Sequence, residues 1–282
     1  MAIVVRGLST GDAAISSDQV AFLRSLFPAL ALTPFMVADA RRLGGQFRKV
    51  LPMLVIRGLL GSAALICYFR AVALIDLSNA ALLCYTSPIF AALFAAAFLK
   101  EPLTARMVGA FSVAFAGVAL VVQPAALLEG RLPPAFAAGT VYALISGAFA
   151  GLAYTAVRHL TGICSTPTIV GMFGWVGTLL CAPLAASKWV APDGLQWLSL
   201  VMVAVLASLG QFYMTRGYAI YKTAHASTMN LSVVIFASLL GALVLHEYPG
   251  PMQIAGIALT LGGITLIDTR TGTAAADEEL TA

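Results

Sequence analysis

Charge is scarce in this sequence. Of the 282 residues, only 10% are Asp, Glu, Lys or Arg, whereas soluble domains carry about 25%. Hydrophobic residues make up 60% of the chain and fill whole segments rather than one face of each helix, and the mean hydropathy is +0.94. This composition excludes an ordinary soluble domain. It predicts an all-α integral membrane protein whose solvent is lipid.

Side chains that perform covalent or metal chemistry are also few. The four cysteines show no CxxC or Cys/His spacing, so we expect neither a disulfide framework nor a metal site. The three histidines lie at the ends of predicted spans. Catalytic motifs such as GxSxG and HExxH, and paired intramembrane carboxylates, do not occur. We therefore expect no enzyme and no cofactor.

The net charge is +4, which in a soluble protein would raise nucleic acid as a partner. Here the basic residues cluster in short loops such as "DARRLGGQFRK", and there is no basic surface helix. Loop arginines and lysines are the orientation signal of membrane proteins. The expected partners are therefore the lipid bilayer and a small-molecule metabolite, and not nucleic acid.

Apolar segments of the length needed to cross a bilayer, about 20 residues, recur along the chain. The predicted spans are 19–38, 53–74, 77–99, 104–122, 135–157, 166–187, 195–220, 223–245 and 251–267. The linkers between them are short and contain Pro, Gly or charge, so none can hold a soluble domain. The polar tail, residues 269–282, is predicted to be disordered.

An internal repeat relates the two halves. A shift of 146 residues places Arg70 on Arg216, Glu101 on Glu247 and Gly117 on Gly263. The first repeat is assigned to residues 1–123 and the second to 135–268, with five helices in each. The first repeat lacks the front half of its first helix, which leaves ten helices nominally and about nine full spans. Either this helix is naturally short or the gene start is truncated, and we favour the second.

Five spans are an odd number, so the two repeats must enter the membrane from opposite sides. Inverted repeats of this kind are typical of secondary transporters. The cluster Arg41, Arg42, Arg48 and Lys49 places its loop on the inside. This orientation puts the C-terminus in the cytoplasm, and we expect a multi-pass protein of the cell inner (plasma) membrane.

The two repeats resemble a known family. "SNAALLCYTSPIFAALFAAAFLKEPLTARMVGAFSVAFAGVALVV" and its copy "HASTMNLSVVIFASLLGALVLHEYPGPMQIAGIALTLGGITLI" are similar to the closing helices of EamA-type members of the drug/metabolite transporter superfamily. The second copy departs from the first by having Val233 and Val234 in place of Ser87 and Pro88. The resemblance implies ten helices, a central cavity between the repeats, alternating access and outward movement of small metabolites.

Polar and aromatic residues within spans are the candidate substrate-binding residues. They are Tyr85, Thr86, Ser87, Tyr154, Trp175, Gln211, Tyr213, Asn230 and Ser232. Each could instead serve helix packing. Arg70 joins them as a residue that could draw an anionic group to the cavity mouth, although it could also reach the interface or form a structural pair.

These observations predict a secondary transporter, an exporter or exchanger, of a small polar metabolite such as an amino acid. The alternative is a non-transporting scaffold or receptor-like membrane protein, and a membrane enzyme ranks third. Glu101 and Glu247 could cap the helix that follows each of them or serve as proton sites. A homodimer is an open alternative for the assembly.

Overall fold

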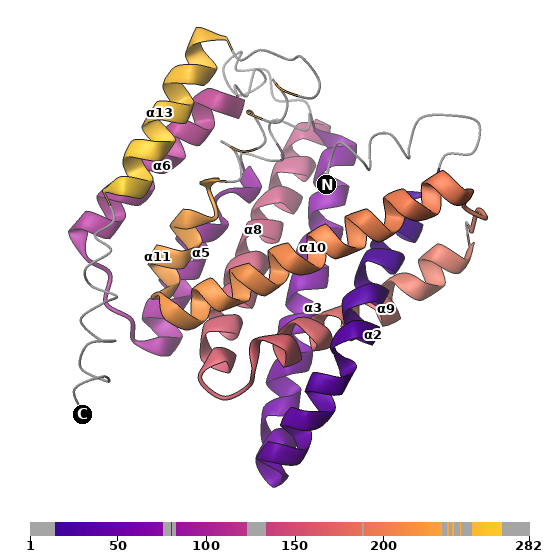
Figure 1. Cartoon of the computed structure of the whole chain (residues 1–282). Coiled ribbons are helices and arrows are strands. Elements are labelled where there is room, and N and C mark those ends of the chain that lie inside the picture. Colours follow the sequence, from indigo (N-terminus) through magenta and orange to yellow (C-terminus); the bar gives the residue numbers. More distant parts are fainter. Residues whose placement is uncertain are drawn as a thin grey trace. The chain divides into compact units, whose positions relative to one another are not determined.

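The computed structural model describes residues 15–75, 80, 83–122, 134–187, 189–232, 236, 239, 243 and 250–266. Within these ranges all regular secondary structure is helical (Figure 1). The all-α class expected from the composition is therefore confirmed.

The helices follow the predicted spans closely. They are α2 (Ser17–Leu43), α3 (Gly45–Leu74), α5 (Ser87–Phe94) with the π-helix η1 (Ala95–Leu99), α6 (Ala105–Val122), α8 (Pro134–Thr161), α9 (Thr166–Ser187), α10 (Gly194–Ile220), α11 (Thr223–Met229) and α13 (Pro251–Thr265). Among the residues described, five helices are long and apolar enough to cross a membrane, namely α2, α3, α8, α9 and α10. A multi-pass membrane protein is thus confirmed, while the count of ten helices stays a prediction.

One clear difference from the predicted spans is the start of α3. The sequence pattern placed it at residue 53, but the helix begins at Gly45, directly after the turn at Gly44. Gly44 has a φ of 52°, and its backbone N–H donates to the oxygen of Ala40 to close α2. The earlier start matters because it moves Arg57 from the end of a span to about three turns inside a helix.

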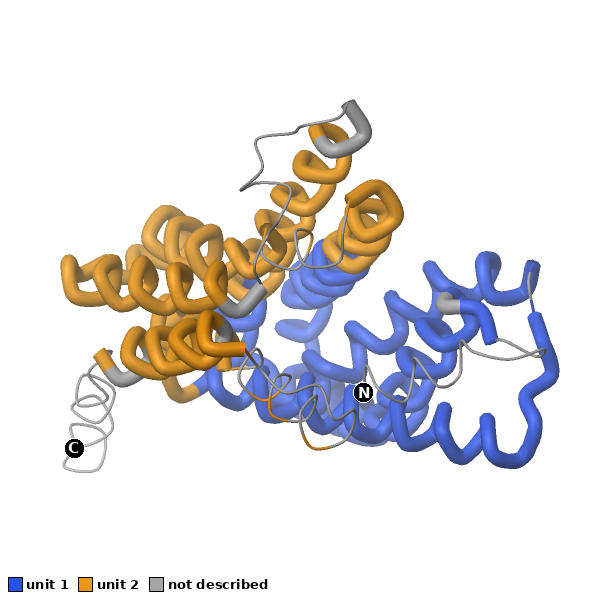
Figure 2. The backbone as a smooth tube through the Cα atoms, turned by 90° about the horizontal axis from the view of Figure 1, so that it is seen from above, with its two compact units in different colours: residues 1–62, 156–219 blue, residues 63–155, 220–282 orange. Residues whose placement is uncertain are grey.

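The chain divides into two compact units, shown in different colours in Figure 2. Unit 1 comprises residues 1–62 and 156–219, and unit 2 comprises 63–155 and 220–282. Each unit therefore takes one part from each predicted repeat. The repeats describe a relation within the sequence, and they are not separate compact bodies.

Unit 1 is built on close packing of α2 against α9, which lie side by side in Figure 1. A Cβ added at Gly174 would lie 2.7 Å from the backbone nitrogen of Ala29, and one at Gly177 would lie 2.8 Å from Oγ of Ser25. Such distances leave no room for a side chain, so the glycines let the two backbones approach closely. Gly174 and Gly177 therefore serve helix packing in unit 1.

Unit 2 contains a reciprocal contact between α6 and α13. A Cβ at Gly117 of α6 would overlap the backbone nitrogen of Thr260, and a Cβ at Gly263 of α13 would overlap that of Ala114. In the 146-residue register, Gly117 corresponds to Gly263 and Ala114 to Thr260. Each helix thus offers its partner the equivalent surface, as expected for elements related by a two-fold operation.

Two carboxylates stabilise helix starts that are distant in the sequence. Oδ2 of Asp39 accepts from the backbone nitrogen of Ser165 at 2.8 Å, just before α9. Oε2 of Glu101 accepts from the backbone nitrogen of Thr223 at 2.8 Å, at the start of α11. Capping by Glu101 was expected, but at the next helix along the chain. The structure assigns its carboxylate to a helix from the other repeat, while Glu247 lies outside the described residues.

Replacing Gly263 by alanine should lower the midpoint of thermal unfolding by a few degrees, because overpacking typically costs about 1–3 kcal/mol. Gly262 is its matched control, since a Cβ there meets nothing within 4 Å. Gly262→Ala should leave the midpoint unchanged or raise it slightly, because alanine favours helix. Thermal unfolding of both purified variants in detergent tests this, and equal midpoints would contradict the packing described.

Candidate functional site

Two of the predicted spans are interrupted by turns at corresponding positions. The predicted span 77–99 contains a turn at Tyr85 and Thr86, directly before α5. The predicted span 223–245 contains a turn at Asn230 and Leu231, directly after α11. In the 146-residue register Tyr85 corresponds to Leu231, so the two interruptions overlap. Interrupted helices at equivalent places in two repeats are the typical setting of a transporter binding site.

The local sequence explains both turns. Pro88 stands in the first turn of α5, where its missing N–H is tolerated, and the hydroxyl of Thr86 donates to the oxygen of Leu83 at 2.6 Å. At the end of α11 the hydroxyls of Ser227 and Thr228 both donate to the oxygen of Ala224, at 3.1 and 2.9 Å. Hydroxyls bonded back onto a helix carbonyl weaken and bend the helix.

Both turns lie against the same part of α6. Leu231 is buried in a cluster with Ala114 and Val118, and Tyr85 packs against that cluster. The packing of α5 against α11 accompanies this convergence. Five predicted site residues lie at or directly beside the two turns, namely Tyr85, Thr86, Ser87, Asn230 and Ser232.

Tyr154 of α8 adds a second phenol near this site. Its helix approaches α5 closely: a Cβ at Gly151 would lie 2.7 Å from the backbone nitrogen of Ala91, and the hydroxyl of Thr155 donates to the oxygen of Ala91 at 3.3 Å. A Cβ at Gly147 would lie 2.8 Å from Oγ1 of Thr86. Gly147 and Gly151 therefore let α8 lie directly along the turn before α5.

A buried arginine forms the second candidate site, in unit 1. Only 2% of Arg57 is exposed. Its Nη2 donates to Oε1 of Gln211 at 3.1 Å, and its guanidinium carbon lies 4.1 Å from the ring centroid of Phe173. The cluster joins α3, α9 and α10. Arginine within an apolar helix is costly, and such residues commonly mark solute or ion pathways.

Sequence reasoning missed Arg57 and singled out Arg70 instead. The signal was present, because Arg57 follows the apolar run "LPMLVI" and precedes another. It was lost because the span was begun at residue 53, which made Arg57 look like a flanking charge. In the structure Arg70 is exposed and lies close to the end of α3, so Arg57 is the deeply buried arginine of this helix.

The remaining predicted site residues lie in different surroundings. Nε1 of Trp175 donates to Oγ1 of Thr33 at 3.0 Å, which links α9 to α2. Tyr213 is 69% exposed and meets Phe212 edge to face. Neither contact places these residues at the paired turns or beside Arg57, so their part in binding stays a prediction.

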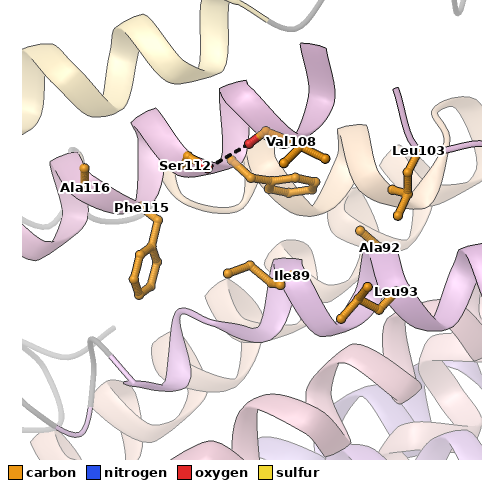
Figure 3. A pocket seen from close by; sticks show the side chains of 9 residues that line it. Ile89, Ala92, Leu93, Leu103, Val108, Ser112, Phe115 and Ala116 are labelled. Atoms are coloured by element: carbon orange, nitrogen blue, oxygen red, sulfur yellow. Dashed lines mark hydrogen bonds between the residues drawn. The ribbon is translucent and has the colours of Figure 1, made fainter. Parts of the chain in front are cut away.

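An apolar groove with a volume of about 400 Å³ lies between α5 and α6 of unit 2 (Figure 3). Its lining is Ile89, Ala92, Leu93, Leu103, Val108, Phe111, Ser112, Phe115 and Ala116. Ser112 brings the one hydroxyl, and Figure 3 shows it bonded to the oxygen of Val108, at 3.0 Å. The hydroxyl hydrogen is thus used within α6, and the other side chains that line the groove are apolar.

Comparison with known proteins agrees with the helices and the repeat. The model of the EamA-like transporter family matches residues 4–123 and 137–269. The chain is 30% identical to the pseudopaline exporter CntI of Pseudomonas aeruginosa, over 93% of this chain and 89% of that protein. It is 28% identical to the "Probable terminal-alkyne amino-acid exporter" of Streptantibioticus cattleyicolor, over 68% of this chain and 64% of that protein.

A protein of known crystal structure has the same fold. Its TM-score to this chain is 0.73. The match covers 93% of this chain and 91% of that protein, and the sequences are 18% identical. The relatives with named activities are transporters and not enzymes. On its apolar helices and the match of the family model to nearly its whole length, the chain belongs to the EamA-like transporter family.

Proposed function

We propose that this protein is a secondary transporter, an exporter or exchanger, of a small polar metabolite such as an amino acid. The observation that carries the proposal is the pair of helix turns at equivalent repeat positions. Turns within apolar helices expose backbone groups that a solute can bind, and here they carry Tyr85, Thr86, Ser87, Asn230 and Ser232. The solute would bind there, near the middle of the membrane, between elements of the two repeats.

The class of solute is inferred from two sources. One relative is described as an amino-acid exporter, and amino acids carry both an acceptor carboxylate and a donor ammonium group. The candidate residues offer both kinds of partner, because hydroxyls and amides donate as well as accept. Arg57 with Gln211 supplies a further donor-rich cluster in unit 1.

Alternating access by two inverted five-helix repeats is the proposed mechanism. The reciprocal contact of Gly117 with α13 and of Gly263 with α6 supports the two-fold relation that inverted repeats require. The loop arginines favour a cytoplasmic C-terminus, and the proposed location is the inner membrane of the cell. A homodimer is compatible with this mechanism and is not required by it.

Flux through reconstituted vesicles tests transport itself. Proteoliposomes that contain the purified protein should release or exchange at least one amino acid from a labelled panel, faster than vesicles without protein. A non-transporting scaffold would give the rate of empty vesicles for every solute. That outcome would contradict the proposed function.

The paired turns predict which variants lose transport. Asn230→Ala should lower the uptake rate at a fixed solute concentration by roughly tenfold, as expected for one lost hydrogen bond of about 1.5 kcal/mol. Its expression should be normal. Leu195→Ala is the control, since Leu195 is 73% exposed and belongs to neither candidate site, and it should transport like the wild type. Equal rates for both variants would remove Asn230 from the site.

Two variants of Glu101 distinguish a role as a helix cap from a role as a proton site. Glu101→Gln keeps an oxygen that can accept from the backbone nitrogen of Thr223, so transport and its pH dependence should be unchanged. Glu101→Ala removes the acceptor and should lower thermal stability by about 1 kcal/mol. Loss of pH-dependent transport in Glu101→Gln, with normal stability, would instead assign a proton to this carboxylate.

A further inference from the structure

The contact between Arg57 and Gln211 determines how the glutamine amide is oriented. An arginine side chain has five N–H donors and no acceptor. Gln211 must therefore turn Oε1 towards Arg57, and Oε1 accepts from Nη2 of Arg57 at 3.1 Å. Its NH2 group is then directed elsewhere, and among the described residues no group accepts a hydrogen bond from it. The amide thus presents two donors from a half-buried side chain.

Arg57 is itself held in place by packing. Its guanidinium lies over the ring of Phe173 at 4.1 Å, which is a favourable cation–π arrangement. A Cβ at Gly61 would lie 2.8 Å from Nη1 of Arg57 and 2.9 Å from Cε2 of Phe173. The absence of a side chain at Gly61, one turn after Arg57, therefore makes room for the stacked pair. Glycine, ring and guanidinium form one rigid support for the glutamine.

We propose that Arg57 is a positioning residue that makes Gln211 a selective donor for an acceptor group, above all a carboxylate, of a solute that passes this cluster in unit 1. Without Arg57 the amide is free to rotate by half a turn and present its oxygen instead. An oxygen would repel a carboxylate and accept from an amine. The arginine therefore acts on selectivity through the glutamine rather than by touching the solute, consistent with its 2% exposure.

This inference rests on the proposed function, and two measurements separate them. The first is thermal stability of the purified full-length protein, which needs no solute. Gln211→Glu should keep or raise the unfolding midpoint, because a carboxylate at this position accepts from Arg57 as Oε1 does. Gln211→Ala should lower the midpoint, because it removes the acceptor from a buried guanidinium.

The second measurement is selectivity in proteoliposomes, with leucine and 3-methylbutylamine as probes. The amine has the same side chain as leucine and lacks the carboxylate. The wild type should prefer leucine. Gln211→Glu should reduce the preference by about tenfold or more through KM, because it removes the donors and adds a like charge. Arg57→Gln should do the same, and Arg57→Lys, which retains a charged donor, should restore part of the preference.

Arg158→Gln is the matched control for a structural role. Nη1 of Arg158 donates to the oxygens of Tyr218 and Ala219 at 2.9 Å, so this arginine also links a helix to α10 in unit 1. Its loss should lower the unfolding midpoint and leave the preference unchanged. The double variant of Arg57→Gln with Gln211→Glu should be no less selective than either single variant, since both act on one donor group.

The outcomes separate the two proposals. A wild type that transports leucine, with Arg57 and Gln211 variants that change only the maximal rate, overturns the positioning role and leaves the transporter proposal standing. A drop in the midpoint of Gln211→Glu equal to that of Gln211→Ala overturns the amide orientation, whatever is transported. A wild type that moves neither probe nor any other amino acid overturns the proposed function, and the selectivity inference with it.

Discussion

Hydrocarbon offers no hydrogen bonds, and every polar backbone group in the membrane must find its partner within the protein. This constraint explains why side-chain contacts of the described chain concentrate where helices start, stop or turn. The hydroxyl of Thr86 donates to the oxygen of Leu83, and the carboxylate of Glu101 accepts from the first backbone N–H of α11. Nearby side chains thus supply bonds at the turn before α5 and at the start of α11.

Close packing is the second consequence of a lipid solvent. Since lipid tails are as apolar as the helices, association depends on contact rather than on exclusion of water. Glycines at the crossings of α2 with α9 and of α6 with α13 bring backbones together. A further glycine, Gly61, makes room for the guanidinium of Arg57 beside Phe173. Small residues thus serve both the scaffold and the candidate site.

Most of the helices could be predicted because span length and turn residues act locally. The segment 166–187 coincides with α9, and the segment 104–122 nearly coincides with α6. The start of α3 was wrong because "RRLGGQFRKVLP" is polar, and a polar helix extension carries no hydropathy signal. Neither turn was predicted, because the spans 77–99 and 223–245 were taken as continuous. Pro88 marks the first turn in the sequence, whereas the turn at Asn230 depends on hydroxyl bonds that no spacing rule reveals.

Composition, repeat and motif by themselves determined the membrane class, the family resemblance and the list of polar residues within spans. They did so because hydropathy and internal similarity are properties of the chain alone. Only the tertiary structure decided that Glu101 caps α11 rather than the next helix, and that Arg57 lies against Gln211 and Phe173. These contacts join residues more than a hundred positions apart, and their partners are chosen by helix packing, which a single sequence does not contain.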